Sequence, residues 1–328
     1  MIRGREIRGP EPDAAACENE SADPQILAIL RVKRTQMTFP VDDRHADARH
    51  IRRVFSRAAR GYDAAAHLAR RIGSELVGRL DVVRLQPKTV IDIGTGTGHC
   101  ARLLEARYRR ARIIGIDSAA AMTHEAAAQR RWRSRQRYLV AAAERLPMAD
   151  ATAQLAVSNL ALMWSDLRQV FPELHRVLAP GGLLMFTTLG PDTLQELRAA
   201  WQTVDSMPHI HPFLDMHILG DALLESGFAE PVMDVERVVV TYPSHHAALH
   251  ELKRCGWQNV SPHRRWTLTG RNRFEGFVRA YESYCDADGR WPLTFEIVYG
   301  HAWTPAAPTL PRRSVRVGID KPGAASRG

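Results

Sequence analysis

The segment Val90–Gly98 reads VIDIGTGTG, a short apolar run that leads into glycines at three alternate positions. The apolar run predicts a buried strand over Thr89–Ile93, and the pattern that follows predicts a helix over Gly98–Arg109. Glycine lets a backbone approach a ligand closely, and the first turn of a helix offers unpaired N–H groups. The segment therefore predicts a ligand site formed by a strand, a glycine turn and a helix.

The spacing of the glycines argues against a nicotinamide or flavin dinucleotide. The fingerprint G-x-G-x-x-G would need glycine at position 99, where this chain has His99. The spacing G-x-G-x-G, with an aspartate just ahead of it, instead resembles the first motif of the S-adenosylmethionine-dependent methyltransferases. The cofactor-binding residues that this resemblance implies are Asp92, Gly94, Gly96 and Gly98.

Beyond this segment the apolar period switches repeatedly between two and 3.6 residues. The pattern predicts strands at Arg112–Ile116, Leu155–Asn159 and Leu183–Thr188, with helices at Ala119–Trp132 and Leu167–Leu178. Each crossover is long enough for a right-handed βαβ unit. The chain is therefore expected to have an α/β fold built on a layered sheet.

Further elements are expected on both sides of this region. The helical patterns His50–Arg60 and Ala64–Leu80 precede the first strand, and we expect them to fold over the ligand-bearing edge of the sheet as a lid. After Thr188 the pattern is less regular. It predicts helices near Met216–Ser226, His245–Cys255 and Arg273–Cys285, and strands near Val232–Thr241 and Leu293–Tyr299.

Three later positions complete the expected cofactor site. Asp117 ends the second strand, where a carboxylate can accept both hydroxyls of a ribose; capping of the following helix is the alternative. The segment Ala142–Pro147 (AAERLP) resembles the methyltransferase loop that holds adenine, which implicates Ala143 and Glu144. In that loop of the methyltransferases an aspartate commonly stands where this chain has Ala142, so here the backbone alone would hold the adenine amino group.

The fourth strand ends at Asn159, at the edge of the sheet where substrates meet cofactors in open α/β folds. Asn159 is therefore a candidate site residue. Met163 and Trp164 follow in the loop and fit plain packing equally well.

Flanking segments resemble the malonyl-acyl-carrier-protein O-methyltransferases of biotin synthesis. These segments are Phe55–Asp63 (FSRAARGYD), His211–Leu223 (HPFLDMHILGDAL), Gly256–Asn259 (GWQN), Leu268–Gly270 (LTG) and Tyr299–Trp303 (YGHAW). The resemblance spans about Ile51 to Trp303. It implies a Rossmann-like class I methyltransferase with a seven-stranded, mostly parallel sheet, helices on both faces, an N-terminal helical lid and extra C-terminal helices.

The resemblance also implies an activity. Such enzymes transfer a methyl group from S-adenosylmethionine to the free carboxylate of a malonyl thioester on acyl carrier protein, which starts pimeloyl synthesis for biotin. The resemblance places Tyr62 beside the cofactor as the catalytic candidate, with packing in the lid as the alternative. Because the malonyl carboxyl is ionised at pH 7, we expect an arginine counter-charge and no catalytic base.

The formal net charge of +9 fits an acidic partner such as a carrier protein. Arg264, Arg265, Arg271 and Arg273 surround the LTG segment and are candidates for a docking surface, with a solvated basic loop as the alternative. A nucleic-acid partner would call for a recognisable reading module or a basic run with interleaved aromatics. We therefore expect no nucleic acid and a monomeric enzyme.

We expect a cytoplasmic protein without a metal site or disulfides. Its 45% hydrophobic residues form no run long enough to span a membrane, and its N-terminus lacks the apolar core of a secretory signal. The four cysteines lie far apart, which favours neither disulfides nor a thiolate zinc site. The histidine spacings do not supply a third metal ligand, so no metal site is expected.

The expected organisation is a mobile arm over residues 1–45, a methyltransferase domain over 46–304 and a disordered tail over 305–328. Translation starting at Met37 would remove most of the arm. Two other functions stay open: a small-molecule methyltransferase of the quinone type, and a methyltransferase-fold assembly factor of respiratory complex I.

Overall fold

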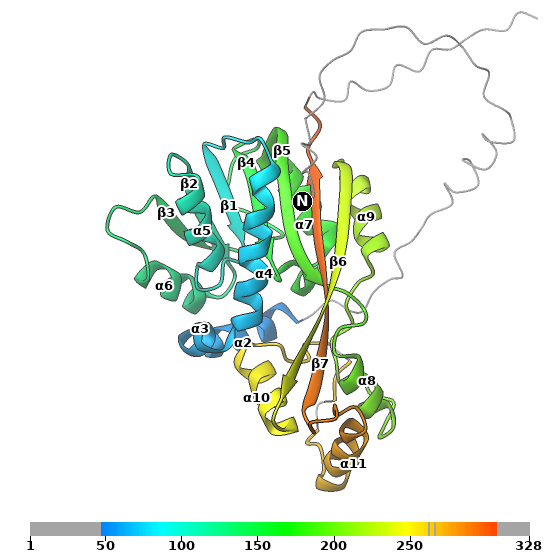
Figure 1. The fold of residues 1–328 in the computed structure, drawn as a ribbon. Coiled ribbons are helices and arrows are strands. Elements are labelled where there is room, and N and C mark those ends of the chain that lie inside the picture. Colours follow the sequence, from blue (N-terminus) through cyan, green and yellow to red (C-terminus); the bar gives the residue numbers. More distant parts are fainter. Residues whose placement is uncertain (1–46, 262, 266, 307–328) are drawn as a thin grey trace, which may run out of the picture.

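The computed structural model describes residues 47–306 except positions 262 and 266. Within them, seven strands form one sheet in the order β3-β2-β1-β4-β5-β7-β6. Strands β1 to β5 pair in parallel, and β7 pairs antiparallel with both β5 and β6 (Figure 1). The strands are β1 (Thr89–Ile93), β2 (Arg112–Asp117), β3 (Gln136–Val140), β4 (Ala153–Asn159), β5 (Leu178–Leu189), β6 (Ala229–Tyr242) and β7 (Trp291–Trp303). The expected seven-stranded, mostly parallel sheet is confirmed.

Helices cover both faces of the sheet. Helices α4 (His67–Gly78) and α5 (His99–Arg107) pack on one face, and α7 (Leu167–Val177) and α9 (Met216–Glu225) pack on the other. The side chains alternate along each strand, so Val90 joins the first cluster and Ile91 the second, and both are fully buried.

The lid is smaller than the sequence predicts. Helices α2 (Ala48–Ala58) and α3 (Tyr62–Ala65) lie at the carboxyl ends of the parallel strands (Figure 1). The second predicted lid helix is instead α4, which belongs to the core: Ile72 and Leu76 are each 1% exposed. The apolar face of α4 is wide enough to cover the sheet, so the helix packs in the core and does not fold over the edge of the sheet as a lid.

The C-terminal region adds a second lobe to the sheet. Strands β6 and β7 extend beyond the parallel strands, and their far ends are surrounded by α8 (Gln195–Gln202), α10 (His245–Arg254) and α11 (Arg271–Glu282) (Figure 1). No described helix combines the length and the apolar character that a membrane crossing requires.

Two local differences from the prediction have clear causes. Helix α6 (Ala120–Ala128) ends before the predicted Trp132, which is 93% exposed in a solvated basic turn. Helix α8 is absent from the sequence analysis because one of its buried positions is the acid Glu196, which accepts hydrogen bonds from the backbone N–H and hydroxyl of Thr294. A buried acid interrupts the apolar pattern by which such a helix is recognised.

The predicted arm, residues 1–45, and residues 307–328 of the predicted tail lie outside the described residues.

Candidate active site

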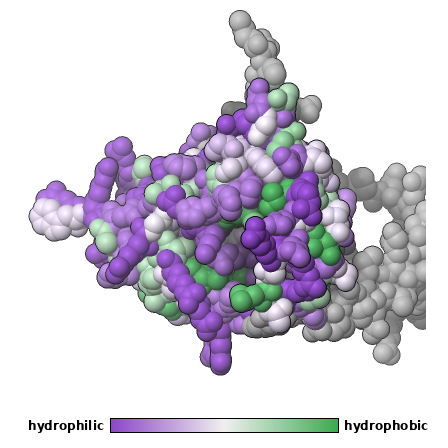
Figure 2. Space-filling model, turned by 90° about the horizontal axis from the view of Figure 1, so that it is seen from below, coloured by the Kyte–Doolittle hydropathy of each residue, from purple (hydrophilic) through white to green (hydrophobic). Residues whose placement is uncertain are grey.

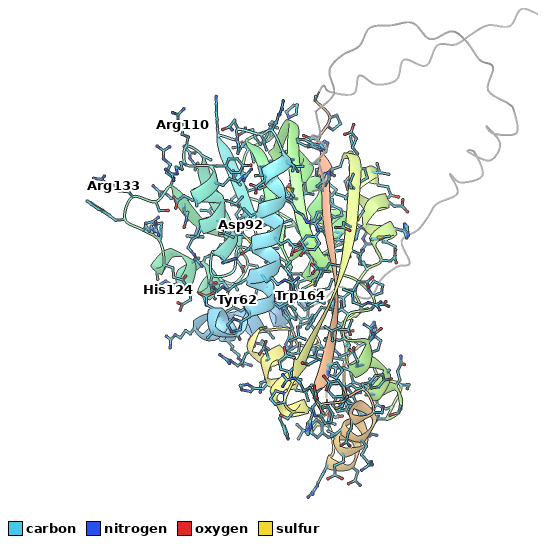
Figure 3. All side chains as sticks on the ribbon, in the orientation of Figure 1. Tyr62, Asp92, Arg110, His124, Arg133 and Trp164 are labelled. Carbon is cyan, nitrogen blue, oxygen red and sulfur yellow. The ribbon has the colours of Figure 1, made fainter. Side chains whose placement is uncertain are left out.

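A cleft lies at the carboxyl ends of β1, β2 and β4, beneath the lid helix α2. Figure 3 shows Tyr62 and Trp164 at this end of the molecule, with Asp92 farther up beside the strands. Two predicted site residues, Asp92 and Gly98, do not line the cleft. The predicted residues that do line it are Tyr62, Gly94, Gly96, Asp117, Ala143, Glu144 and Asn159.

The glycine turn adopts the left-handed conformation that its sequence requires. Gly94, Gly96 and Gly98 have φ values of +66°, +54° and +83°. A Cβ atom on Gly94 would lie 2.1 Å from the Cβ atom of Ala161, so glycine is needed for the close approach of the loop after β4. A Cβ atom on Gly96 would meet nothing within 4 Å, which leaves open space at the cleft.

Asp117 joins the turn to the start of α6. Its Oδ2 accepts from the Gly96 N–H at 3.0 Å, and its Oδ1 accepts from the Ala119 N–H at 2.8 Å. Burial raises the pKa of this carboxyl, and the two backbone hydrogen bonds oppose that rise. A carboxylate has about four acceptor sites, so Asp117 can contact the helix start and still accept hydrogen bonds from a ligand.

Asp92 lies beneath the turn. It is 1% exposed, and its Oδ2 accepts from the Thr95 hydroxyl at 2.7 Å. Burial raises the pKa of Asp92 to about 7, against the lowering effect of hydrogen bonds from Thr95 and the Ala101 backbone. The Asp92 side chain therefore stabilises the conformation of the turn and does not line the cleft.

Asn159 connects three elements where β4 ends. Its Nδ2 donates to the Ala69 carbonyl of α4 at 2.9 Å, and its Oδ1 accepts from the Thr187 hydroxyl of β5 at 2.8 Å. The side chain therefore ties α4 to the sheet at the wall of the cleft.

Tyr62 is half-buried in the lid, and its hydroxyl has no hydrogen-bond partner among the described residues. Burial raises the pKa of the phenol, so Tyr62 is a neutral donor at pH 7. The adjacent Asp63 accepts from the Thr97 hydroxyl and from the Gln129 amide, at 2.5 and 2.8 Å. Asp63, to which the sequence analysis gave no role, thus fastens the lid to the turn and to α6.

Helix α2 supplies further lining residues that the sequence analysis did not identify. Ala48, Ile51, Arg52 and Phe55 recur at helical spacing and face the cleft. Among the described residues that line this cleft, Arg52 is the only lysine or arginine, and it forms no ion pair there. The helical spacing of Arg52 with the apolar residues around it is the sequence signal that could have identified this wall of the cleft.

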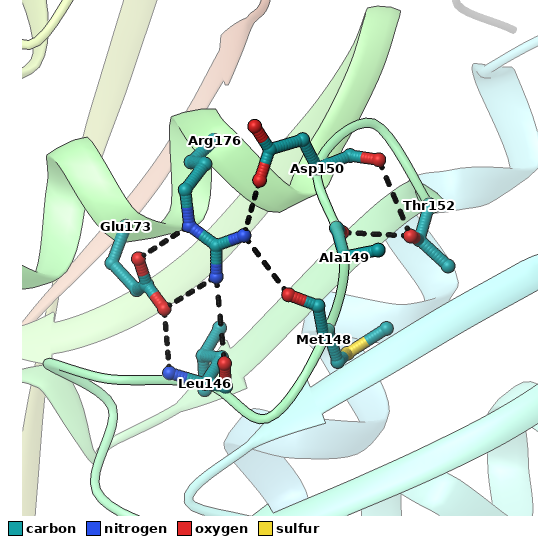
Figure 4. A network of polar contacts seen from close by, with 7 residues as sticks. All are labelled: Leu146, Met148, Ala149, Asp150, Thr152, Glu173 and Arg176. Atoms are coloured by element: carbon teal, nitrogen blue, oxygen red, sulfur yellow. Dashed lines mark hydrogen bonds and ion pairs between the residues drawn. The ribbon is translucent and has the colours of Figure 1, made fainter.

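The wall that contains Ala143 and Glu144 continues into a loop held by one arginine (Figure 4). Arg176 donates to the Met148 carbonyl at 2.9 Å and to Glu173 through Nε and Nη2, at 2.8 and 2.7 Å. Glu173 in turn accepts from the Leu146 N–H at 2.6 Å. This network anchors the loop to α7.

The four arginines of the predicted docking surface separate into two groups. Arg265 is paired with Asp205 at 3.6 Å with its side chain 21% exposed, and Arg264 donates to the Ser261 carbonyl. Arg271 and Arg273 lie exposed on α11, where Arg271 pairs with Glu275 at 2.7 Å. Only the second group is exposed, because Arg264 and Arg265 are half-buried in contacts within the chain.

The fold and the cleft define a Rossmann-like class I methyltransferase. Residues 91–186 match the Methyltransferase domain family. The fold is similar to that of the YcgJ protein of Bacillus subtilis, with a TM-score of 0.53 at 15% identity over 71% of this chain and 99% of that chain.

Sequence similarity defines the family more narrowly. The chain is 41% identical over 290 residues to the malonyl-[acyl-carrier protein] O-methyltransferase of Nitrosospira multiformis, which covers 83% of this chain and 93% of that protein. It is 43% identical over 285 residues to the protein of the same name from Laribacter hongkongensis, which covers 84% and 95%. The chain belongs to the malonyl-[acyl-carrier protein] O-methyltransferase family.

Proposed function

We propose that this chain transfers a methyl group from S-adenosylmethionine to the free carboxylate of a malonyl thioester on acyl carrier protein. The product is the malonyl methyl ester that starts pimeloyl synthesis for biotin. The observation that carries the proposal is the identity of 41% and 43% to two proteins of that name over more than nine-tenths of their length. The glycine turn and Asp117 at the cleft support it.

The residues at the cleft fit this cofactor. Open space lies over Gly96, and Asp117 retains acceptor sites that suit the two hydroxyls of a ribose. The wall of Ala143 and Glu144 would lie against the adenine. When bound, the cofactor supplies a methyl group on a sulfonium, whose sulfur leaves without needing a proton.

The protein therefore positions reactants and performs no acid–base step. The malonyl carboxylate is ionised at pH 7, and its oxygen forms the C–O bond as the C–S bond breaks. No proton is transferred. Alignment of these atoms in a site that excludes water is worth up to roughly 7 to 11 kcal/mol.

Three lid residues are proposed to do this positioning. Arg52 supplies the counter-charge for the carboxylate, because it is the one lysine or arginine among the described residues that line the cleft. Tyr62 donates a hydrogen bond from its neutral phenol. Phe55, whose ring lies edge-on to Trp164 at 5.9 Å, closes the site against water.

The proposed partner is a malonyl-loaded acyl carrier protein that approaches the exposed arginines of α11. A quinone-type acceptor is less favoured, because its phenol or ring carbon requires a base, and no histidine is among the described residues that line the cleft.

Transfer of label from methyl-labelled S-adenosylmethionine tests the proposal. Malonyl carrier protein, acetyl carrier protein and a quinone-type phenol are offered in parallel. We expect label on malonyl carrier protein alone, in a form that mild base releases. Label on the phenol, or equal label on the acetyl and malonyl carrier proteins, would contradict the proposal.

A further inference from the structure

A second cavity lies next to the cofactor cleft. Its walls come from the end of β5, from α8, from α10 and from residues 209–213 and 257–259. Trp164 lines both cavities, so they lie on either side of its side chain. A molecule that occupied the second cavity would therefore have one end beside the proposed site of methyl transfer.

The walls of this cavity are mostly apolar and are braced by aromatic stacking. Trp201 lies between His209 and Phe277, with ring centroids 3.8 and 4.3 Å away. Trp257 lies edge-on to Phe295 at 5.2 Å. Such a wall is preformed and suits a long ligand with an uncharged middle. Figure 2, which views the molecule from this end, shows hydrophobic patches set into a mainly hydrophilic face.

One cation stands on the lining of the second cavity. Lys253 lies in the last turn of α10, is exposed, and is the only lysine or arginine among the described residues that line this cavity. It forms no ion pair or hydrogen bond through its side chain with the described residues. Because Lys253 is exposed and Trp164 is half-buried, the lysine marks the end of the cavity that opens to solvent.

We propose that the second cavity receives the phosphopantetheine arm of the malonyl carrier protein and that Lys253 pairs with the phosphate of that arm. The inference rests on the proposed function. The malonyl end must reach the cofactor cleft while the carrier protein stays outside, so the arm has to run from the surface inward. Its amides and thioester then lie along the apolar walls, and its phosphate lies at the mouth with the ammonium group.

The variant Lys253→Met tests the pairing, with Lys88→Met as the matched control. Lys88 is the other lysine in the described part of the chain; it is exposed at the amino end of β1, at the opposite edge of the sheet. A screened surface pair is worth up to about 1 kcal/mol, or roughly five-fold in affinity. We therefore expect KM for malonyl carrier protein to rise about five-fold in Lys253→Met, with kcat unchanged and Lys88→Met unaffected.

A competition experiment identifies the phosphate as the group recognised. Malonyl-phosphopantetheine and malonyl-pantetheine, which lacks the phosphate, compete with malonyl carrier protein. The phosphorylated compound should compete more strongly against the wild type, and this advantage should vanish in Lys253→Met. A lysine that only complements the dipole of α10 would change the melting temperature and leave the advantage intact.

Equal competition by the two compounds, or no competition by either, would overturn the inference. So would an unchanged KM in Lys253→Met. These outcomes differ from failure of the proposed function, in which the wild type forms no methyl ester on malonyl carrier protein.

Discussion

Replacement of Asp117 by alanine should weaken cofactor binding by ten-fold or more. Asp117 keeps acceptor sites free at the cleft after accepting from Gly96 and Ala119. A hydrogen bond to a charged acceptor is worth about 1.5 to 3 kcal/mol, which corresponds to roughly 10- to 150-fold in Kd. The lower end of this range is expected. Burial of the Asp117 carboxylate has a desolvation cost, which also raises its pKa, and the variant removes that cost together with the hydrogen bonds.

Isothermal titration with S-adenosylhomocysteine measures this affinity without turnover. The variant also loses two bonds to the backbone, so part of any loss reflects a looser turn. Asp63→Ala is the matched control, because Asp63 also accepts two hydrogen bonds, one from Thr97 of the turn and one from Gln129 at the end of α6, but does not line the cleft. Its melting temperature should fall by a similar amount, with a much smaller change in Kd.

Two results would refute this reasoning. An unchanged Kd in Asp117→Ala would show that the carboxylate serves the helix start alone. Equal losses of affinity in the two variants would show that tethering of the turn, and not a contact with the ribose, accounts for the effect.

Arg52→Met should raise KM for malonyl carrier protein about ten-fold, while Arg53→Met, at the neighbouring exposed position, should leave KM unchanged. Steady-state kinetics measure both values, and an equal rise in KM for the two variants would exclude Arg52 as a specific counter-charge. Burial raises the pKa of Asp92 from its usual 3.8 to about 7, so the native state binds more protons between these pH values and its stability falls as pH rises through them. Asp92→Asn should therefore gain melting temperature relative to the wild type as pH rises from about 4 to about 7, and a constant difference over this range would contradict this. Neutralising Arg271 and Arg273 with glutamine should raise KM for malonyl carrier protein and flatten its salt dependence, while malonyl-coenzyme A kinetics stay the same; equal losses for both substrates would place these arginines elsewhere in the mechanism.

The parallel half of the fold was predictable because its signals are local. The segment Val90–Gly98 carries a strand, a turn and a helix start within nine residues, and β1 has the predicted bounds. The C-terminal lobe depends on contacts between distant residues. Glu196 is buried on α8 because Thr294 of β7 supplies its donors, and no local pattern indicates that pairing.

The same distinction holds at the site. Asp117 and Asn159 end their strands, and strand ends of a parallel sheet share one edge, so their place at the cleft followed from the pattern. Asp92 is also adjacent to the turn, but the direction of its side chain depends on the pleat of β1, which turns it under the loop. Arg265 looked like a surface charge because its partner Asp205 lies sixty residues away.

Mass spectrometry of malonyl carrier protein after incubation with the enzyme and S-adenosylmethionine measures the proposed transfer most directly. The malonyl group should gain the mass of one methylene, the gain should reside on its free carboxylate, and mild base should reverse it. Asp117→Ala should give the same product at a lower rate when the cofactor is limiting. A malonyl group of unchanged mass, with the methyl group found on a protein side chain or on another acceptor, would contradict carboxyl methylation.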